Sequence, residues 1–210
     1  MVTVDPKAAA SAHQFTVVID GVETAVHEGV LRCGGGGTVA VVGPGVLEVT
    51  RLRHVVVRGG GGGDVRFARC GYAAAEGCAA VSFRRCGVVR ADGARGVAVH
   101  RCRSADVERA GAARVRGAGE LRVGRCREAD VAGCARAAVA RCRAARADWC
   151  GALAMGRVGS ADVTRCGAVR VDRCRDASVS GCGAVAVRRG KVSVVEALKP
   201  VSPPPVDQQA

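Results

Sequence analysis

Cysteine is the residue type whose number and spacing here best suit chemistry, because thiolates bind zinc or copper(I) and act as nucleophiles. The 210-residue chain has twelve cysteines. From residue 70 onward every interval between them is a multiple of eight, at positions 70, 78, 86, 102, 126, 134, 142, 150, 166, 174 and 182. No CxxC pair occurs, and Ala, Val or Gly fills the same place in other repeats. We therefore expect inert, buried thiols, with no metal and no cofactor.

Arginine precedes the cysteine place in ten of the sixteen eight-residue units. If three units form one 24-residue coil, one edge carries Arg141, Arg165 and Arg189 as axial neighbours, and another carries Trp149 with Arg101, Arg125 and Arg173. Guanidinium groups grip phosphate or sulfate with paired hydrogen bonds, so these six arginines are the candidate polyanion-binding residues. The alternative is a solubilising surface that is rich in arginine because the genome is GC-rich.

Two pairs of aspartates are the candidate acidic sites. In the 24-residue register Asp106 stacks on Asp130 and Asp148 stacks on Asp172, each pair roughly 4.8 Å apart. Such a pair can bind a cation or raise the pKa of one carboxyl. The alternative is a solvated residue paired with neighbouring arginines. The four histidines are scattered and complete no triad or zinc set, so we assign no catalytic residue.

The eight-residue unit predicts a short strand followed by a corner. Sixteen units between residues 63 and 190 share the consensus x-x-[AVL]-x-V-x-[RG]-C, with apolar third and fifth places and polar neighbours. This period of two is typical of a strand with one buried face. Strands so short can bury that face only by stacking on copies of themselves, which predicts a solenoid.

The number of units in one coil is the open choice. Two units give a flattened 16-residue coil with six inward side chains, and three give a triangular 24-residue coil with nine. Both registers find support in the sequence. We favour three units because they build the larger core, which places Val123 between Val99 and Ala147.

The rhythm of residues 167–171 (GAVRV), Cys174, residues 177–179 (ASV) and Cys182 resembles that of right-handed parallel β-helices of the pectin-lyase-like family. The resemblance covers roughly residues 37–190 and implies an all-β fold, a right-handed parallel β-helix (β-solenoid). Cysteine stands where relatives often stack asparagine, which this chain lacks. The family includes polysaccharide lyases and hydrolases as well as viral and accessory proteins, so it implies an architecture rather than an activity.

The sequence divides into three parts. We expect a flexible N-terminus at residues 1–14, a β-helix domain at residues 15–190, and an extension with a proline-rich disordered tail at residues 191–210. Within the domain, residues 15–36 form an atypical first coil or cap, and residues 37–190 form regular units.

A formal net charge of +13 favours contact with nucleic acid or anionic glycans. No signal peptide or membrane segment is seen, so we expect an intracellular protein, cytoplasmic or nuclear, or a virion component. The expected function is a non-catalytic scaffold, compatible with a homo-oligomer, that recognises a protein or polyanion by its outer surface. The alternative is a carbohydrate-processing lyase or hydrolase, active or degenerate, although only 2% of the residues are aromatic.

Overall fold

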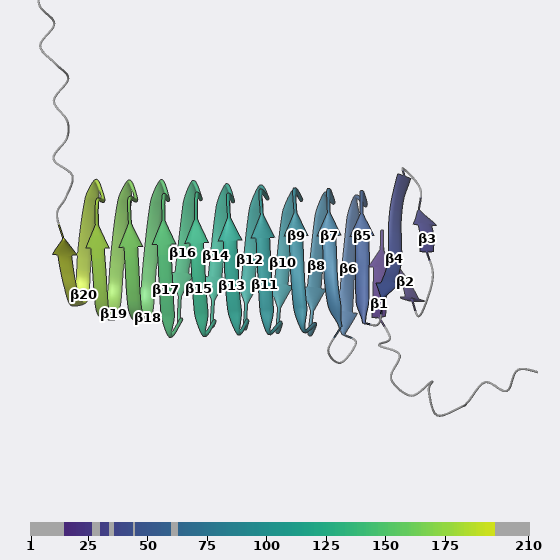
Figure 1. Cartoon of the computed structure of the whole chain (residues 1–210), viewed down its shortest axis with the longest axis horizontal. Helices are drawn as coiled ribbons and strands as arrows, with labels where there is room; N and C mark the ends of the chain where they lie inside the picture. The colour runs from purple at the N-terminus through teal and green to yellow at the C-terminus, as the bar shows by residue number, and fades with distance from the viewer. Residues whose placement is uncertain (1–14, 27–29, 34–35, 44, 60–62, 196–210) are drawn as a thin grey trace, which may run out of the picture.

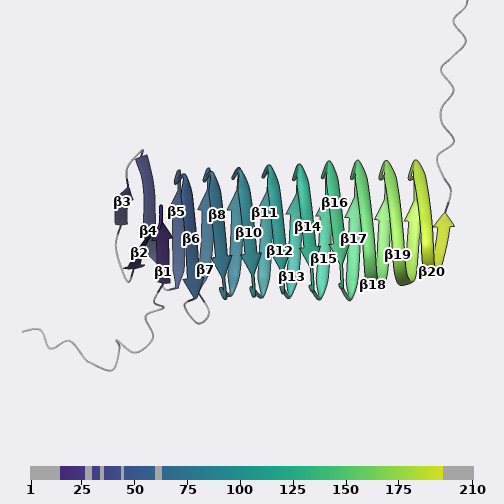
Figure 2. The same cartoon turned by 180° about the vertical axis from the view of Figure 1, so that it is seen from behind.

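The computed structural model describes residues 15–26, 30–33, 36–43, 45–59 and 63–195. The chain is a parallel β-solenoid of about nine turns, with 72% of the described residues in strands. Figure 1 shows the turns stacked side by side in one straight row, and the view from behind in Figure 2 shows the same order. The expected flexible N-terminus (1–14) and most of the expected tail (196–210) lie outside the described residues.

The described part of the chain contains twenty strands in sequence order. They are β1 (Phe15–Ile19), β2 (Val22–Val26), β3 (Val30–Cys33), β4 (Gly37–Gly43), β5 (Val46–Thr50), β6 (His54–Gly59), β7 (Asp64–Ala68), β8 (Tyr72–Glu76), β9 (Ala80–Arg84), β10 (Val88–Asp92), β11 (Gly96–His100), β12 (Ser104–Glu108), β13 (Ala112–Arg116), β14 (Glu120–Gly124), β15 (Glu128–Ala132), β16 (Arg136–Ala140), β17 (Ala144–Asp148), β18 (Ala152–Thr164), β19 (Ala168–Ser180) and β20 (Ala184–Val195).

Each turn contains two eight-residue units, so the predicted 24-residue coil is wrong. Val123 pairs in register with Val107 on one side and Val139 on the other, not with Val99 and Ala147. The physical reason is the size of the inward side chains. Valine, alanine and cysteine fill the thin space between two facing sheets, whereas the middle of a triangular coil would need larger groups to reach normal packing density.

Alternate strands form two sheets, and we name the surfaces after them. Face 1 is the outer surface of β5, β7, β9, β11, β13, β15, β17 and the second halves of β18, β19 and β20. Face 2 is the outer surface of β6, β8, β10, β12, β14, β16 and the first halves of β18, β19 and β20. Edge 1 is the line of corners where the chain passes from face 1 to face 2, and edge 2 is the line where it returns.

The core follows the predicted alternation. The third, fifth and eighth places of the units point inward and are buried through nearly all of the stack, and no polar or charged side chain among the described residues is buried. Phe67 and Phe83, one turn apart, stack inside with ring centroids 4.9 Å apart. The interior is therefore apolar from end to end.

Antiparallel strands close the N-terminal end of the solenoid. β1 pairs with β2 and β6, and β4 pairs with β3 and β5. Parallel stacking begins only at β5, so residues 37–43 belong to this cap and not to the regular units as the sequence predicted. Such a cap shields strand edges that would otherwise template further pairing.

Candidate functional site

The residue before each corner has a left-handed backbone. Glycine takes this place at residues 77, 93, 117, 133 and 181, with φ between 60° and 72°. Arginine takes it at residues 51, 69, 85, 101, 109, 125, 141, 157, 165 and 173, with φ between 50° and 58°. The left-handed region costs an ordinary L-residue roughly 1–2 kcal/mol, and glycine avoids that cost. The backbone therefore favours glycine at every one of these corners.

Nine of these arginines form two rows at opposite edges. The edge-1 row is Arg51, Arg69, Arg85 and Arg101, and the edge-2 row is Arg109, Arg125, Arg141, Arg157 and Arg173. Backbone hydrogen bonds join successive turns at these corners, as when the Arg125 N–H donates to the Ala140 carbonyl at 3.1 Å. Members of a row therefore follow each other at about one strand spacing, about 4.8 Å.

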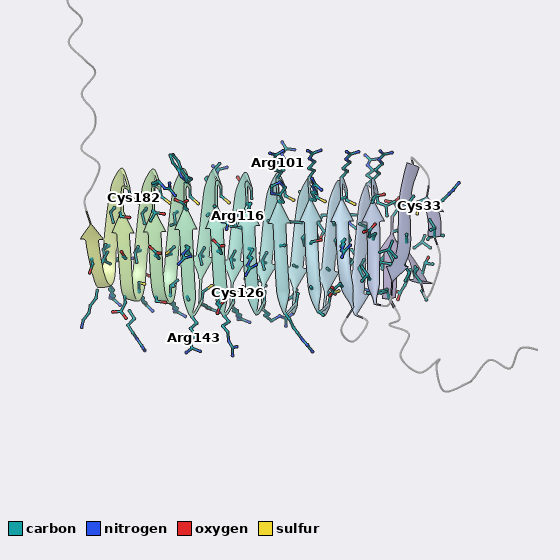
Figure 3. The ribbon with its side chains drawn as sticks, viewed as in Figure 1. Cys33, Arg101, Arg116, Cys126, Arg143 and Cys182 are labelled. Atoms are coloured by element: carbon teal, nitrogen blue, oxygen red, sulfur yellow. The ribbon has the colours of Figure 1, made fainter. Side chains whose placement is uncertain are left out.

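The two rows lie in opposite halves of the rod. The edge-1 row occupies the N-terminal half, and the edge-2 row occupies the C-terminal half. Figure 3 shows Arg101 projecting from one edge and Arg143, which follows the edge-2 corner at Arg141, projecting from the other. All arginines of both rows have exposed side chains.

Two of the nine row arginines directly follow a carboxylate, Arg109 after Glu108 and Arg173 after Asp172, and the other seven do not. Gly124, Ala140 and Gly156 immediately precede three arginines of the edge-2 row. Thr50, Ala68, Arg84 and His100 precede the four of the edge-1 row. Across the described residues, Arg109 is the one row member that makes an ion pair, with Asp92. The rows are therefore strings of like charge.

The central ladders of the two faces have a different charge pattern, because arginine and carboxylate alternate from turn to turn in parts of them. Beside the edge-2 corners, face 2 instead carries three carboxylates in successive turns, Glu76, Asp92 and Glu108. Arg66 lies in register with Glu48, with a nitrogen–oxygen distance of 3.3 Å, and Arg146 with Asp162 at 3.5 Å. Asp106 lies between Arg90 and Arg122 in the ladder of face 2. In these parts of the central ladders, opposite charges therefore neutralise each other locally.

The six predicted arginines are divided between the two edges. Arg125, Arg141 and Arg173 lie in the edge-2 row, and Arg101 lies in the edge-1 row. Arg189 lies beside Asp172 at an irregularity that ends the edge-2 corners. Arg165 is at edge 1, so the predicted Arg141–Arg165–Arg189 row is wrong.

Trp149 has a different neighbour from those that the sequence predicted. It occupies an edge-1 corner with φ 52° and is 62% exposed. Arg125 and Arg173 are at the opposite edge, and Arg101 is three corners away. The guanidinium carbon of Arg165 instead lies 5.1 Å from the centroid of the Trp149 ring, within the range of a cation–π contact.

The two predicted aspartate pairs do not form. Asp106 is on β12 of face 2 and Asp130 is on β15 of face 1. Asp148 is on β17 of face 1 and Asp172 is on the face-2 half of β19. The cause is again the 16-residue turn, since residues 24 apart fall on opposite sheets.

Three of these aspartates have basic partners instead. The Asp130 carboxylate accepts hydrogen bonds from Arg116 at 3.2 and 2.7 Å, and Asp106 is flanked by arginines as described above. Asp148 accepts from Arg165 Nε at 2.9 Å and Nη2 at 2.6 Å and from Thr164 Oγ1 at 2.7 Å. The Arg165 bonds first, and the Thr164 bond second, lower the pKa of Asp148. These carboxylates neutralise arginines and form no acidic cluster.

The cysteines line the inside of both edges. Every described cysteine except Cys33 is buried, and none is in a disulfide. Hydrogen bonds between thiols one turn apart raise the pKa of Cys102, Cys126 and Cys150, and burial raises it further. The same bonds lower the pKa of their partners Cys86, Cys142 and Cys134. Burial also raises the pKa of Cys78 to about 11. All of these thiols are buried in the apolar interior, as the sequence predicted, and their low reactivity stays a prediction.

Corner carbonyls give the thiols a structural partner. The Sγ–H of Cys126 donates to the Gly124 carbonyl at 3.4 Å, and the same contact two residues back recurs at most other corners. Alanine replaces cysteine at residues 94, 110 and 118, so the bond is not required for the turn. The place selects a small side chain.

Comparison with known proteins identifies no relative: no family model, curated protein or solved structure matches this chain. Within residues 15–195, apart from the undescribed gaps, no three or more His, Cys, Asp or Glu residues are grouped to hold a metal ion. The same part of the chain has no helix long and apolar enough to span a membrane.

Proposed function

We propose that this β-solenoid is a non-catalytic scaffold that binds polyanions along its two arginine rows. The observation that supports this function is the contrast between corners and faces. Opposite charges alternate in parts of the central ladders of the faces, which stabilises a ladder, whereas arginine follows arginine at the corners, which destabilises it. A polyanion laid along a row would remove that repulsion.

Base composition does not account for arginine at the corners. Glycine and arginine are both encoded by GC-rich codons, so a GC-rich genome has no reason to prefer arginine over glycine there. Glycine would also relieve the left-handed backbone and the charge repulsion together. Residues 117 and 133 show that the fold accepts glycine at the corners of edge 1.

The length of a row suits a linear ligand. The five arginines of the edge-2 row span about 19 Å, at about 4.8 Å per turn. Each guanidinium can form two parallel hydrogen bonds with a phosphate or sulfate group. A nucleic acid or a sulfated glycan presents such groups at regular intervals, and a relationship to pectin-lyase-like proteins, which we retain as part of the proposal, would favour the glycan.

The carbohydrate-processing alternative loses its proposed site. A glycoside hydrolase needs two carboxyl groups close to the same bond. Here the predicted aspartate partners lie on opposite sheets, and arginines occupy the ladder places beside Asp106 and Asp130. An intracellular or virion location remains a prediction that fits a binding scaffold.

Three variants with four Arg→Gln substitutions each test the proposal. The first changes the edge-2 residues Arg125, Arg141, Arg157 and Arg173, and the second changes the edge-1 residues Arg51, Arg69, Arg85 and Arg101. The matched control changes Arg66, Arg90, Arg114 and Arg146, which lie at strand centres on the faces. All three variants lose the same charge. Affinity for duplex DNA and for heparin is measured over a range of salt concentrations.

We expect both row variants to bind more weakly and to depend less on salt. The slope of log K against log salt should decrease by up to about 0.9 for each arginine that contacts a DNA phosphate. The face variant should retain most of the affinity. Equal losses in all three would show that binding reports only net charge, and wild-type affinity in both row variants would exclude the rows.

A further inference from the structure

A hollow lies at the N-terminal end of the edge-1 row, where the first parallel turns meet the cap. It opens on the face-1 side of the corners and has a volume of about 450 Å³, which is within the range of small-molecule sites. Arginines and hydroxyl groups form most of its lining: Thr38, Thr50, Arg51, Arg69, Arg84 and Arg85. Figure 3 shows long side chains with terminal nitrogen atoms projecting from this edge between the labelled Arg101 and Cys33.

The strand register explains why the hollow forms. One ladder of face 1, at the strand ends next to edge 1, contains in order Thr38, Thr50, Ala68 and Arg84. Ala68 has the smallest side chain of the four, so it leaves space between Thr50 and Arg84. The corner arginines of the same turns border that space along the edge. The hollow is therefore a gap in a polar ladder, with cationic side chains on two of its sides.

The four arginines of the hollow have no carboxylate partner. No described residue that lines the hollow is acidic, and none of its arginines forms an ion pair with any other residue that the structure describes. Glu48, also on face 1, pairs with Arg66. Asp20 lines a separate hollow across the corners, which shares Arg51 and Arg69. The hollow therefore concentrates positive charge that an anion can neutralise.

The two threonine hydroxyls add a hydrogen-bond donor. Thr38 Oγ1 lies 2.7 Å from Thr50 Oγ1, so one hydroxyl donates its proton to the other. Each hydroxyl carries one proton, so the accepting hydroxyl keeps its own proton for another acceptor. An anion in the hollow can accept this proton together with the N–H groups of the arginines.

We propose that this hollow binds the terminal phosphate of a nucleic-acid strand, an inference that rests on the proposed function of the rows. A terminal phosphate monoester carries about 1.5 to 2 negative charges at pH 7 and three acceptor oxygens. An internal phosphodiester and a sulfate ester each carry a single charge. The hollow adds Arg84 and the two hydroxyls to the corner arginines, whereas Gly124, Ala140 and Gly156 precede arginines of the edge-2 row. The denser set of donors suits the more highly charged end of the strand.

The position of the hollow also suits a strand end. Arg51 is the first arginine of the edge-1 row, and Gly36, just before β4, borders the hollow on the cap side. Beyond Arg51 the row therefore offers no further phosphate contact. A strand that runs along edge 1 from Arg101 toward the cap meets its last row arginines in the hollow.

Oligonucleotides that differ only at their ends test the proposal. Affinity of the full chain is measured for a short single strand with a 5′-phosphate, with a 3′-phosphate, and with hydroxyl groups at both ends. A hydroxyl-ended strand that is one nucleotide longer is the control, because its added charge is an internal phosphodiester. We expect a phosphorylated strand to bind about tenfold more tightly than either hydroxyl-ended strand, because hydrogen bonds between charged groups are strong.

Arg84→Gln tests the hollow without changing either row. It should remove most of the preference for the phosphorylated strand and change the affinity for the hydroxyl-ended strand little. Arg116→Gln removes the same charge from the same ladder two turns away, outside the hollow, and should keep the preference. Thr38→Val combined with Thr50→Val should also weaken the preference, with an unchanged circular dichroism spectrum as the check of folding.

Equal affinity for phosphorylated and hydroxyl-ended strands would overturn this proposal, whereas the proposed function is decided separately by the row variants on duplex DNA and heparin. Equal loss of the preference in Arg84→Gln and Arg116→Gln would also overturn it, since the preference would then report only net charge. At constant ionic strength, inorganic phosphate should displace the phosphorylated strand more readily than sulfate does. Equal competition by the two anions would show a general anion site and overturn the assignment of phosphate.

Discussion

The corners and the faces of this solenoid are built from the same eight-residue unit but distribute their charge in opposite ways. On face 1, Arg114 is followed one turn later by Asp130, then by Arg146 and Asp162. At edge 2, arginine follows arginine through five successive corners. A ladder of alternating charge contributes to folding, whereas a ladder of like charge works against it. The corners are therefore where selection for folding alone would not place arginine.

The interiors of the two edges differ in their cysteine content but not in their strand register. Edge 1 has cysteine inside every corner from residue 70 to 182 except Ala118, whereas edge 2 has Ala94, Ala110 and Val158 among its cysteines. At both edges, the strands that flank the corners pair with the strands of the next turn at the same spacing of 16 residues. The row arginines themselves point outward, so we expect that they can be replaced without disturbing the core at either edge.

Reversing charge within a row should have the largest effect on binding. Arg141→Glu combined with Arg157→Glu removes two positive charges from the centre of the edge-2 row and adds two negative ones. We expect affinity for DNA at low salt to decrease roughly 100-fold, because phosphate contacts dominate such binding. The face variant Arg66→Glu with Arg90→Glu carries the same charge change and should lose much less. Comparable losses of DNA affinity in the two variants would show that edge and face arginines contribute equally to binding.

Glycine at a row corner should separate binding from stability. Arg141→Gly relieves the left-handed backbone, so urea unfolding should show a gain of about 1 kcal/mol, together with weaker DNA binding. The same change at Arg114, in the middle of β13, should destabilise by about 0.5–1 kcal/mol, because glycine weakens a strand. A loss of stability in Arg141→Gly would mean that the row arginines support the fold.

Removing one carboxylate from a face should leave neighbouring arginines without a neutralising charge, as at the edges. Asp130→Asn leaves Arg114, Arg116 and Arg146 without their shared acid, so we expect a loss of about 0.5 kcal/mol in unfolding free energy and tighter DNA binding at low salt. Glu128→Gln removes the same charge from a residue that makes no ion pair within the described residues. If Glu128→Gln changes the unfolding free energy and the DNA affinity by the same amounts as Asp130→Asn, the alternation of charge along the ladder does not explain either effect.

The smallest effect concerns Arg165, a corner arginine that, like Arg109, has a carboxylate partner. Its hydrogen bonds, with that of Thr164, hold the pKa of Asp148 below its usual value. This contribution to stability is present above pH 4 and is lost as the pH falls through the lowered pKa of the folded state. Carboxyl NMR titration should show the low pKa, and Arg165→Gln should raise it toward the ordinary value. Arg165→Gln should also weaken DNA binding less than Arg141→Gln does.

The sequence alone determined the unit of this fold. Its period of two within each unit predicted a strand, its small eighth residue predicted a corner, and strands too short to be stable alone predicted stacking. These inferences are local, because they depend on which side chains of one unit are apolar. The burial of Val123, Cys126 and Val131 confirms them.

Only the tertiary structure decided how many units close one turn. Stacks of two or three units place the same kinds of residue above one another, since both periods are multiples of eight. The choice depends on the volume enclosed by the turn, which no single unit reveals, and side chains as small as valine, alanine and cysteine fill two facing sheets but not a triangle. That choice sets which charges become neighbours. Because each turn has two units, neither aspartate pair forms, and Arg165 and Arg141 lie at opposite edges. The same turn places the arginines from Arg109 to Arg173 in one row.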